Sequence, residues 1–414
     1  MKKGEAPVVI AGGGIGGLTL ALSLHQAGIS CRVFEAAPEI KPLGVGINLL
    51  PHGMRELTEL GLQERLARVA VETRELCFYN RFGQFIYKEP RGRFAGYAWP
   101  QLSIHRAELH RVLLDATRER LGSDGVVLDM RCVSFRQEHG KVEVKFQDGS
   151  TVEGSCLVGA DGIHSVVRKA LFPQEGPPSY KGINMWRGVT RAKPYLTGAS
   201  MAVAGWLEVG KIVVYPIQPP GADGVQWINW VAEIQSPRNV VQDWALAGKL
   251  ADFHPTFADW TFDWMDCGAL LRDADMILEY PMVDRDPLPW WTRGRVTLLG
   301  DAAHPMYPRG SNGAGQAILD ARVLAGCLKR ESEIEKALKK YESERLEAAN
   351  QVVLMNRANP PDAILREVWK RSGDRPFARI EDVISATELA ELSENYKRVA
   401  GFERESLSRR PSYV

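Results

Sequence analysis

Three glycines near the start of the chain have the spacing of a phosphate-binding turn. They are Gly12, Gly14 and Gly17, and they follow the apolar residues 8–11. Glycine at these places permits a tight turn, a close approach of the backbone to a pyrophosphate, and close packing of a helix on its strand. The N–H groups and the dipole of that helix then favour an anion at its N-terminus. The run therefore predicts a nucleotide-binding site, and the alternative is a glycine-rich turn that binds nothing.

A carboxylate follows at the distance that a nucleotide ribose requires. Glu35 comes 18 residues after Gly17 and closes the apolar run 31–34. A carboxylate at this place accepts hydrogen bonds from ribose hydroxyls and repels a 2′-phosphate. The turn and the acid together therefore suit FAD or NAD better than NADP.

Two more carboxylates follow stretches that have the composition of buried strands. Asp161 comes after residues 157–160, and it could simply cap the helix that follows. Asp301 comes after residues 296–300, before a proline- and glycine-rich loop and a helix that begins near Gly313. Ligands of open α/β sheets bind at the carboxyl ends of the strands, so both acids are candidates for ligand binding.

These three motifs, in this order, resemble the single-component FAD-dependent aromatic hydroxylases, the class typified by para-hydroxybenzoate hydroxylase. The resemblance covers roughly residues 6–350. It implies that Arg106 meets the pyrophosphate region, that Asp161 serves both FAD and the nicotinamide donor, and that Asp301 binds the ribityl chain. The residues that we expect to bind the cofactor are Gly12, Gly14, Gly17, Glu35, Val45, Arg106, Asp161, Asp301, Asn312 and Gly313.

The resemblance also implies the reaction. Within the class, residues 40–48, 185–190 and 280–289 look most like the methylphenazine-carboxylate monooxygenases, with salicylate and 3-hydroxybenzoate hydroxylases next. NADH or NADPH would reduce FAD, and the reduced flavin would trap O₂ as a hydroperoxide that an aromatic ring attacks. We expect the helix that begins near Gly313 to stabilise the negative charge of reduced flavin through Asn312 and Gly313. No second nucleotide fingerprint appears, so the nicotinamide donor is expected to bind transiently.

The substrate pocket must keep water away from the reactive oxygen species. A pocket between the flavin and an inserted sheet would serve, although each candidate residue could equally belong to the core. The candidates for its lining are Arg187, Tyr215, Trp230, Met306, Tyr307 and Pro308. The sequence does not identify a base that would ionise a phenol. The candidates for a catalytic group are His304 and Tyr215, and after them His52, although His304 could merely pack in its loop.

The order of predicted elements indicates an α/β fold in two domains with a tail. A Rossmann-like FAD-binding domain is expected from residues 1–72, 98–178 and 280–350. Strand after strand between 182 and 230 indicates an inserted, mainly antiparallel β-sheet domain for the substrate, made of residues 73–97 and 179–279. Residues 351–414 are expected to form a helical tail in which the sequence shows no chemistry.

Composition narrows the choice of partners. With 52 Lys and Arg against 51 Asp and Glu in 414 residues, the net charge of +1 gives no electrostatic case for nucleic acid or an anionic membrane. We therefore expect a small aromatic substrate and O₂ as partners of a monomer or homodimer. Without a signal-like or membrane-spanning segment, a soluble cytoplasmic protein is expected. The six scattered cysteines indicate free, mostly buried thiols and no metal site.

Two other function classes remain open from the sequence. One is a flavoenzyme of different chemistry on the same scaffold, such as an epoxidase or a halogenase. The run 227–230 lacks the Trp-x-Trp-x-Ile pattern of halogenases, and no catalytic lysine loop follows the glycine turn, so the halogenase is disfavoured. The other class is a non-catalytic flavin-binding or redox-sensing protein, which would hold FAD but show no substrate-stimulated oxygen uptake.

Overall fold

The computed structural model describes residues 6–39, 44–236, 246–358 and 360–414. The start of the loop 40–48, up to residue 43, lies outside the described residues. Within the described part of the chain, no helix is long and apolar enough to cross a lipid bilayer.

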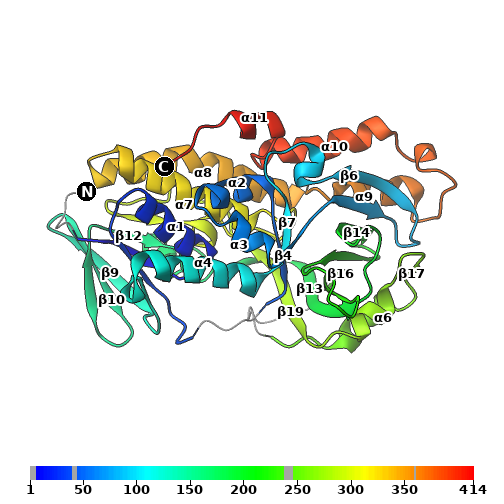
Figure 1. Cartoon of the computed structure of the whole chain (residues 1–414), viewed down its shortest axis with the longest axis horizontal. Coiled ribbons are helices and arrows are strands. Elements are labelled where there is room, and N and C mark those ends of the chain that lie inside the picture. Colours follow the sequence, from blue (N-terminus) through cyan, green and yellow to red (C-terminus); the bar gives the residue numbers. More distant parts are fainter. Residues whose placement is uncertain (1–5, 40–43, 237–245, 359) are drawn as a thin grey trace.

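A five-stranded parallel sheet lies at the N-terminal end of the molecule (Figure 1). Its middle strand carries Val8, Val9 and Ile10, which are fully buried, as expected for a strand covered on both faces. The strands in spatial order are β20 (Val296–Leu298), β12 (Cys156–Gly159), β1 (Val8–Ala11), β2 (Cys31–Phe34) and β8 (Val126–Val127).

Each face of this sheet has its own cover. Three helices pack on one face, namely α1 (Ile15–Gln26), which contacts the other two, α4 (Arg106–Leu121) and α7 (Gly313–Arg330). A three-stranded antiparallel sheet covers the other face, made of β9 (Cys132–Glu138), β10 (Lys141–Phe146) and β11 (Thr151–Gly154). The ring of Phe34 packs 4.7 Å from that of Phe146 across the two sheets. The helix α5 (Val166–Leu171) follows β12.

A third small sheet and two short helices connect this unit to the rest of the chain. The sheet is antiparallel, in the order β3 (Gly46–Leu49), β7 (Leu102–His105) and β4 (Ala70–Glu72). The helices are α2 (Pro51–Glu59) and α3 (Gln63–Ala67). Gly61, with φ of +74°, allows the turn that separates these two helices.

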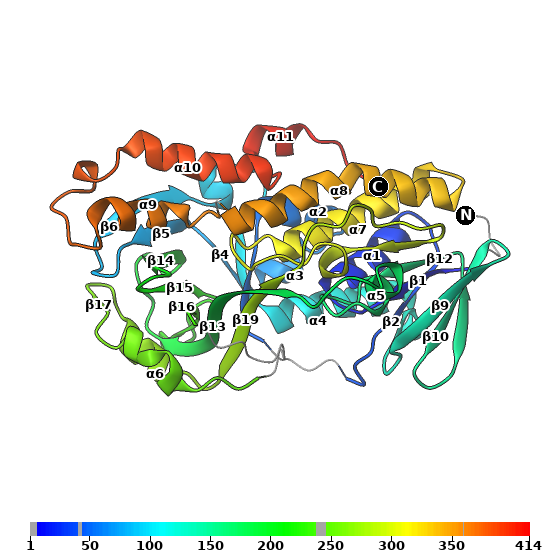
Figure 2. The ribbon, with the colours of Figure 1, turned by 180° about the vertical axis from the view of Figure 1, so that it is seen from behind.

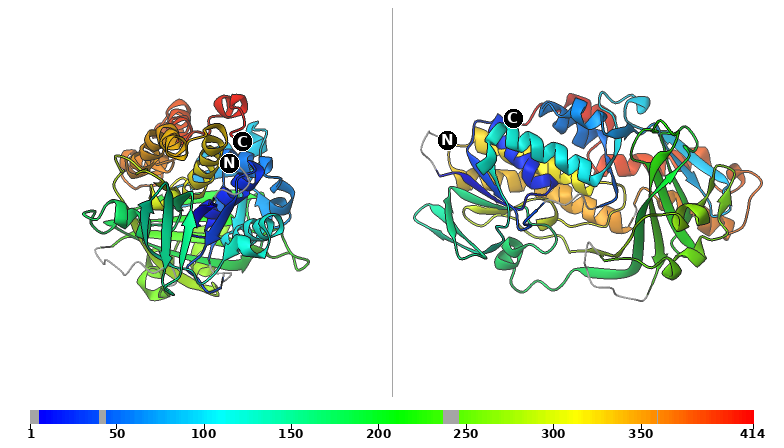
Figure 3. Two further views of the ribbon diagram at one scale, coloured as in Figure 1. Left: turned by 90° about the vertical axis from the view of Figure 1, so that its left-hand side faces the viewer. Right: turned by 60° about the horizontal axis from the view of Figure 1, so that its bottom comes forward.

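The second large sheet has seven strands and lies at the opposite end of the molecule (Figure 2). All of its pairings are antiparallel except that of β14 with β5. In spatial order the strands are β19 (Ile277–Asp284), β13 (Ser179–Ala192), β16 (Gln226–Gln235), β15 (Gly210–Pro216), β14 (Ser200–Trp206), β5 (Glu75–Tyr79) and β6 (Phe85–Pro90). The long strand β13 joins this sheet to the parallel one (Figure 3). One face is covered by residues 250–275, which include β17 (Thr261–Phe262), β18 (Met265–Asp266) and α6 (Cys267–Arg272).

The C-terminal helices run along one side of the whole molecule (Figures 1 and 2). They are α8 (Ile334–Ala358), α9 (Ala363–Ser372), α10 (Ala386–Val399) and α11 (Arg404–Arg409). Leu365 and Val368 of α9 pack on the second face of the seven-stranded sheet, where Val203 and Val231 lie. The chain then returns along α10 and ends beside the parallel-sheet unit. The predicted α/β fold, with a Rossmann-like unit, a mainly antiparallel sheet and a helical tail, is confirmed.

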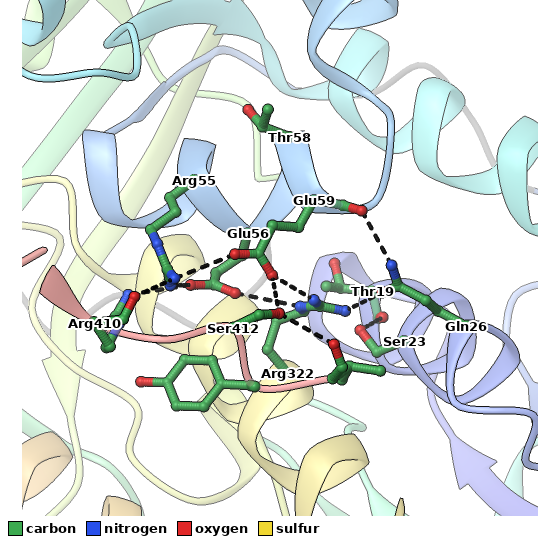
Figure 4. A network of polar contacts seen from close by, with 12 residues as sticks. Thr19, Ser23, Gln26, Arg55, Glu56, Thr58, Glu59, Arg322, Arg410 and Ser412 are labelled. Carbon is green, nitrogen blue, oxygen red and sulfur yellow. Dashed lines mark hydrogen bonds and ion pairs between the residues drawn. The ribbon is translucent and has the colours of Figure 1, made fainter. Parts of the chain in front are cut away.

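A buried cluster of charges anchors this returning end (Figure 4). Glu56 of α2 is completely buried and pairs with Arg55 at 2.6 Å, Arg322 of α7 at 3.2 Å and Arg410 of the tail at 3.1 Å. Arg322 also pairs with Glu59 at 2.9 Å. Removing one member of such a cluster leaves unpaired buried charges, which costs about 3–5 kcal/mol. The cluster therefore fixes the last residues of the chain against α2 and α7.

The six cysteines are free and buried, as the sequence predicted. Burial raises the pKa of Cys156 to about 12, so its thiol stays protonated near neutral pH. The cysteines therefore act as small core residues.

Candidate functional site

The glycine turn joins β1 to α1 and faces open space. A Cβ atom at Gly17 would lie 2.0 Å from the carbonyl oxygen of Gly12, so the helix can pack on its strand only with glycine there. A Cβ at Gly14 would meet nothing within 4 Å. Gly14 is the N-cap of α1, and no side chain caps the helix. The first N–H groups of α1 are therefore free for an anion.

Glu35 lies beside this turn at the end of β2. Its Oε2 accepts a hydrogen bond from the N–H of Gly13 at 2.7 Å, and its Oε1 accepts one from Ala37 at 2.8 Å. Each carboxylate oxygen can accept a second bond, so ribose hydroxyls still find acceptors here. His110 of α4, which the sequence analysis did not single out, holds the other side of the turn through the carbonyl of Gly13 at 2.7 Å. Glu35 thus shapes the turn and can still accept further hydrogen bonds.

Asp161 lies next to the same turn, at the end of β12. A Cβ at Gly12, whose φ is +110°, would lie 2.3 Å from the carbonyl oxygen of Ala160 and 3.0 Å from the Cα of Asp161. The Oδ2 of Asp161 accepts a hydrogen bond from Val166 at 2.8 Å, so the capping interpretation applies to this oxygen. Its Oδ1 is buried without a partner, and burial raises the pKa of the carboxyl group. One oxygen of Asp161 is therefore available to a ligand.

Asp301 and Arg106 both face an enclosed space, and their charges interact. Both side chains are accessible to solvent, yet protein atoms enclose them. Desolvation raises the pKa of Asp301 and lowers that of Arg106, and the attraction between the two charges opposes both shifts. The backbone N–H of Arg106 donates to the carbonyl of Val45 at 3.0 Å. A Cβ at Gly313 would lie 4.0 Å from Oδ1 of Asp301, so the N-terminus of α7 opens onto the same space.

Asn312 is the N-cap of α7 and is buried, with 1% of its surface exposed. Its Nδ2 donates to the hydroxyl of Tyr396 at 2.8 Å, whereas its Oδ1 has no partner. No side chain caps α7. The free N–H groups of the first turn and the dipole of this helix suit negative charge beside Asn312 and Gly313.

A buried group of charges supports the Gly300–Asp301 turn from behind. Asp320 of α7 accepts a hydrogen bond from the N–H of Gly300 at 3.1 Å and pairs with His304 at 2.6 Å and Arg345 at 2.8 Å. Although burial opposes it, the charges of His304 and Arg345 lower the pKa of Asp320 to about 2. His304 is 2% exposed and its Nε2 is taken by Asp320, so it packs behind the turn instead of facing the open space.

The seven-stranded sheet reaches the cofactor side through Gly46, at the start of β3. The N–H of Gly46 donates to Oδ1 of Asn229 at 2.6 Å, and its carbonyl accepts from Arg187 at 2.8 Å. A Cβ at Gly46 would lie 2.6 Å from the ring of Tyr215. Burial raises the pKa of Tyr215, and the positive charge and hydrogen bond of Arg187 oppose this shift. The structure therefore brings the predicted residues Val45, Arg187 and Tyr215 together. Gly46 and Asn229, which were not predicted, lie with them.

Trp230 does not lie with these residues. Side chains alternate between the two faces of a strand, and Trp230 of β16 points to the face opposite that of its neighbour Asn229. Its Nε1 donates to Thr190 at 3.0 Å, and its ring packs 5.7 Å from that of Phe253. The prediction of Trp230 as a pocket residue therefore does not fit, and Trp230 is part of the core behind the sheet.

The predicted pocket residues of the loop before α7 lie in different environments. Met306 packs with Leu50 and Val352, while Tyr307 is buried, with its hydroxyl lacking a partner. Pro308 is exposed. His52 stacks on Phe402 with ring centroids 5.4 Å apart, and burial, with help from nearby arginines, lowers its pKa to about 3. His52 is therefore neutral and belongs to the packing under α7.

Removal of the Asp301 carboxylate should weaken FAD binding far more than it weakens the fold. Asp301→Ala loses an acceptor that faces the internal space and no hydrogen bond to the protein within the described residues. A lost bond to a charged group costs about 1.5–3 kcal/mol, which corresponds to about 10-fold to 100-fold in the dissociation constant of FAD. Equilibrium dialysis of FAD and thermal melts of the apoprotein measure the two effects. An equal loss of melting temperature and flavin, with no rebinding, would contradict this role.

Comparison with known proteins identifies the family of this chain. A family model described as an FAD binding domain matches residues 5–246 and 274–356. The chain belongs to this family. Its relatives include the phenazine 1,6-dicarboxylic acid hydroxylase PhzS of Lysobacter antibioticus, which is 43% identical over 409 residues, covering 95% of this chain and 97% of the relative. The 3-hydroxybenzoate 6-hydroxylase 1 of Aquipseudomonas alcaligenes is 33% identical and covers 82% of this chain and 84% of the relative.

A solved structure has the same fold as this chain. HpxO of Klebsiella pneumoniae, complexed with FAD and uric acid, superposes with a TM-score of 0.76 at 24% identity, over 99% of this chain and 98% of HpxO. The predicted resemblance to the single-component FAD-dependent aromatic hydroxylases is therefore confirmed, and FAD is the cofactor. The protein is a flavin-dependent monooxygenase by family, which sets aside the non-catalytic interpretation.

Proposed function

We propose that this flavoprotein hydroxylates a planar, N-heterocyclic aromatic carboxylate with O₂ and NADH or NADPH. The observation that carries the proposal is the 43% identity to a phenazine 1,6-dicarboxylic acid hydroxylase over nearly the whole of both chains. A second heterocyclic relative, the 6-hydroxynicotinate 3-monooxygenase of Pseudomonas fluorescens, is 29% identical over 89% of this chain. A carboxylated ring that contains nitrogen is common to both names.

The residues of the site fit FAD. The open turn at Gly14, the uncapped α1, and the enclosed but accessible pair Arg106 and Asp301 provide sites for a diphosphate and a polyhydroxyl chain. When bound, FAD supplies the redox chemistry that links the nicotinamide donor, O₂ and the ring. The N-terminus of α7 at Asn312 and Gly313 would stabilise negative charge on the ring system. We therefore propose that the residues predicted from the sequence to bind the cofactor do so.

The seven-stranded sheet would form the wall opposite the cofactor. Arg187 and Tyr215 lie on its face toward Gly46, and the tail covers the rest of that face. A closed wall excludes water, which would otherwise divert the activated oxygen. We propose the same division of labour as the sequence predicted, with residues 73–97 and 179–279 serving the substrate and the parallel-sheet unit serving FAD. Strand β19 continues to Asp284, past the boundary predicted at 279.

The test is the acceleration of nicotinamide oxidation by a ring compound. Stopped-flow reduction of the purified holoprotein is compared for phenazine-1-carboxylate, salicylate, 3-hydroxybenzoate and 6-hydroxynicotinate. We expect the phenazine to accelerate flavin reduction most, and mass spectrometry to find its product heavier by one oxygen atom. If no ring compound accelerated reduction, or if all the oxygen were released as hydrogen peroxide, the proposed function would be wrong.

A further inference from the structure

Arg309 is buried in the loop between the Gly300–Asp301 turn and α7, with 8% of its surface exposed. Its Nε and Nη2 atoms are buried and have no hydrogen-bond partner. In the part of the chain that the structure describes, no other arginine leaves two buried side-chain nitrogens without a partner. A buried donor without an acceptor costs free energy, and more so when it is charged. The arrangement therefore calls for an acceptor that arrives with a ligand.

The two unpaired nitrogens define what that acceptor must be. Nε and Nη2 form one edge of the planar guanidinium group, and their N–H bonds point in nearly the same direction. Such an edge matches the two oxygens of a carboxylate, which it binds through two parallel hydrogen bonds. A single neutral carbonyl could satisfy only one of the two N–H groups of Arg309 fully.

The neighbouring acids pair with a lysine, and neither of them accepts a hydrogen bond from the Nε or Nη2 of Arg309. The Nζ of Lys211, on β15, lies 2.8 Å from Oε2 of Glu233 and contacts Oδ2 of Asp362. Lys211 is only 2% exposed. Although burial opposes it, the charges of Lys211 and Arg309 keep the pKa of Asp362 below its usual value. Arg309 thus contributes to the charge balance of this group while its own hydrogen-bonding edge stays unused.

Arg309 lies between the start of α7 and the seven-stranded sheet. Arg309 belongs to the loop that leads into the N-terminus of α7, and its Cζ lies 6.0 Å from the centre of the Trp206 ring. Trp206 is the last residue of β14 in the seven-stranded sheet. The guanidinium group therefore lies where the unit that ends in α7, the sheet and the tail meet, beside a buried aromatic ring.

We propose that Arg309 recognises the substrate carboxylate, with Nε and Nη2 each donating to one carboxylate oxygen of the aromatic ligand. The inference rests on the proposed function and adds to it the residue that selects an acid over its neutral analogue. Arg309 is thus a specificity-determining residue, and the bound carboxylate completes the hydrogen bonding of its buried guanidinium group.

The experiment compares two ligands that differ only in the group that Arg309 would bind. The probes are phenazine-1-carboxylate and phenazine-1-carboxamide, and binding to the FAD-loaded protein is followed by the change in flavin absorbance. We expect the wild type to prefer the acid. In Arg309→Gln, affinity for the acid should fall about 100-fold while affinity for the amide changes little, because a buried bidentate ion pair is lost. Arg309→Lys should bind the acid with an affinity between those of the wild type and Arg309→Gln, because lysine keeps the positive charge but cannot donate two parallel hydrogen bonds.

The control is Arg191→Gln, which removes an exposed arginine of β13 in the seven-stranded sheet, where it pairs with Asp223 at 2.5 Å. It should bind both probes as the wild type does. Equal losses for acid and amide in Arg309→Gln would overturn the inference, and so would a wild type that binds both probes equally. The second result needs no variant, so it decides the matter even if Arg309→Gln does not fold. A wild type that responds to neither probe, nor to any other ring, would refute the proposed function itself.

Discussion

Gly17→Ala is expected to abolish stoichiometric FAD binding and to lower the stability of the apoprotein. The new Cβ would lie 2.0 Å from the carbonyl oxygen of Gly12, which belongs to the backbone, so no flexible side chain can move aside. Relief requires α1 to shift away from β1, which is the movement that opens the phosphate turn. Overpacking of this kind costs about 1–3 kcal/mol of stability. Dialysis against FAD and thermal melts of the apoprotein measure the two losses.

The matched control is Gly14→Ala. A methyl group there meets no protein atom within 4 Å, and the residue has an ordinary φ of −73°. The apoprotein should therefore fold nearly as well as the wild type, whereas FAD affinity should fall because the methyl group occupies the approach of the diphosphate. Normal FAD binding by Gly17→Ala would contradict the role of Gly17 in packing α1 on β1. A loss of stability in Gly14→Ala as large as that in Gly17→Ala would contradict the open position of Gly14.

Asp320→Asn should give the largest loss of stability among single substitutions near the site. Its carboxylate compensates the buried Arg345 and accepts hydrogen bonds from His304 and Gly300, so an amide leaves a buried cation without its counter-charge. The expected cost at pH 7 is about 3–5 kcal/mol. Denaturant titration measures it, and Glu153→Gln, which removes an exposed pair with Lys141, is the control.

The loss of stability in Asp320→Asn should become smaller as the pH falls. The pKa of Asp320 is lowered from 3.8 to about 2 in the folded state, so the carboxylate stabilises the fold above its unfolded pKa. That contribution is lost as the pH falls from about 4 towards 2, because in this range the unfolded state takes up a proton that the folded state still excludes. The difference between wild type and Asp320→Asn should therefore shrink in this window. A difference that stayed constant down to pH 2 would count against the ionised carboxylate as its source.

The sequence identified the turns because each one depends on local chemistry. Gly12 and Gly17 need the absence of a side chain, and Asp301 follows a short buried strand, so spacing alone revealed them. The face of a strand was harder to predict. Trp230 and Asn229 are neighbours in a strand whose residues are buried on both faces, and composition does not tell which of them faces the cofactor.

The contributions of the tail could not be predicted either. Tyr396, which contacts Asn312, and Asp362, which contacts Lys211, lie far along the chain from their partners. Their sequence surroundings show only ordinary amphipathic helices. A signal was present in Arg309, a charged residue within a proline- and glycine-rich loop, but its significance depends on burial, which only the folded chain reveals.

The position of the tail also has a consequence for synthesis on the ribosome. Chains generally fold from the N-terminus as they emerge, so the parallel sheet and the seven-stranded sheet can form before α9 and α10 are made. Until then, apolar residues such as Val203, Val231 and Met282 have no cover from Leu365 and Val368. The nascent protein therefore exposes an apolar face of the seven-stranded sheet until the tail is made. A truncated product that stops after α8 would be a substrate for chaperones or proteases.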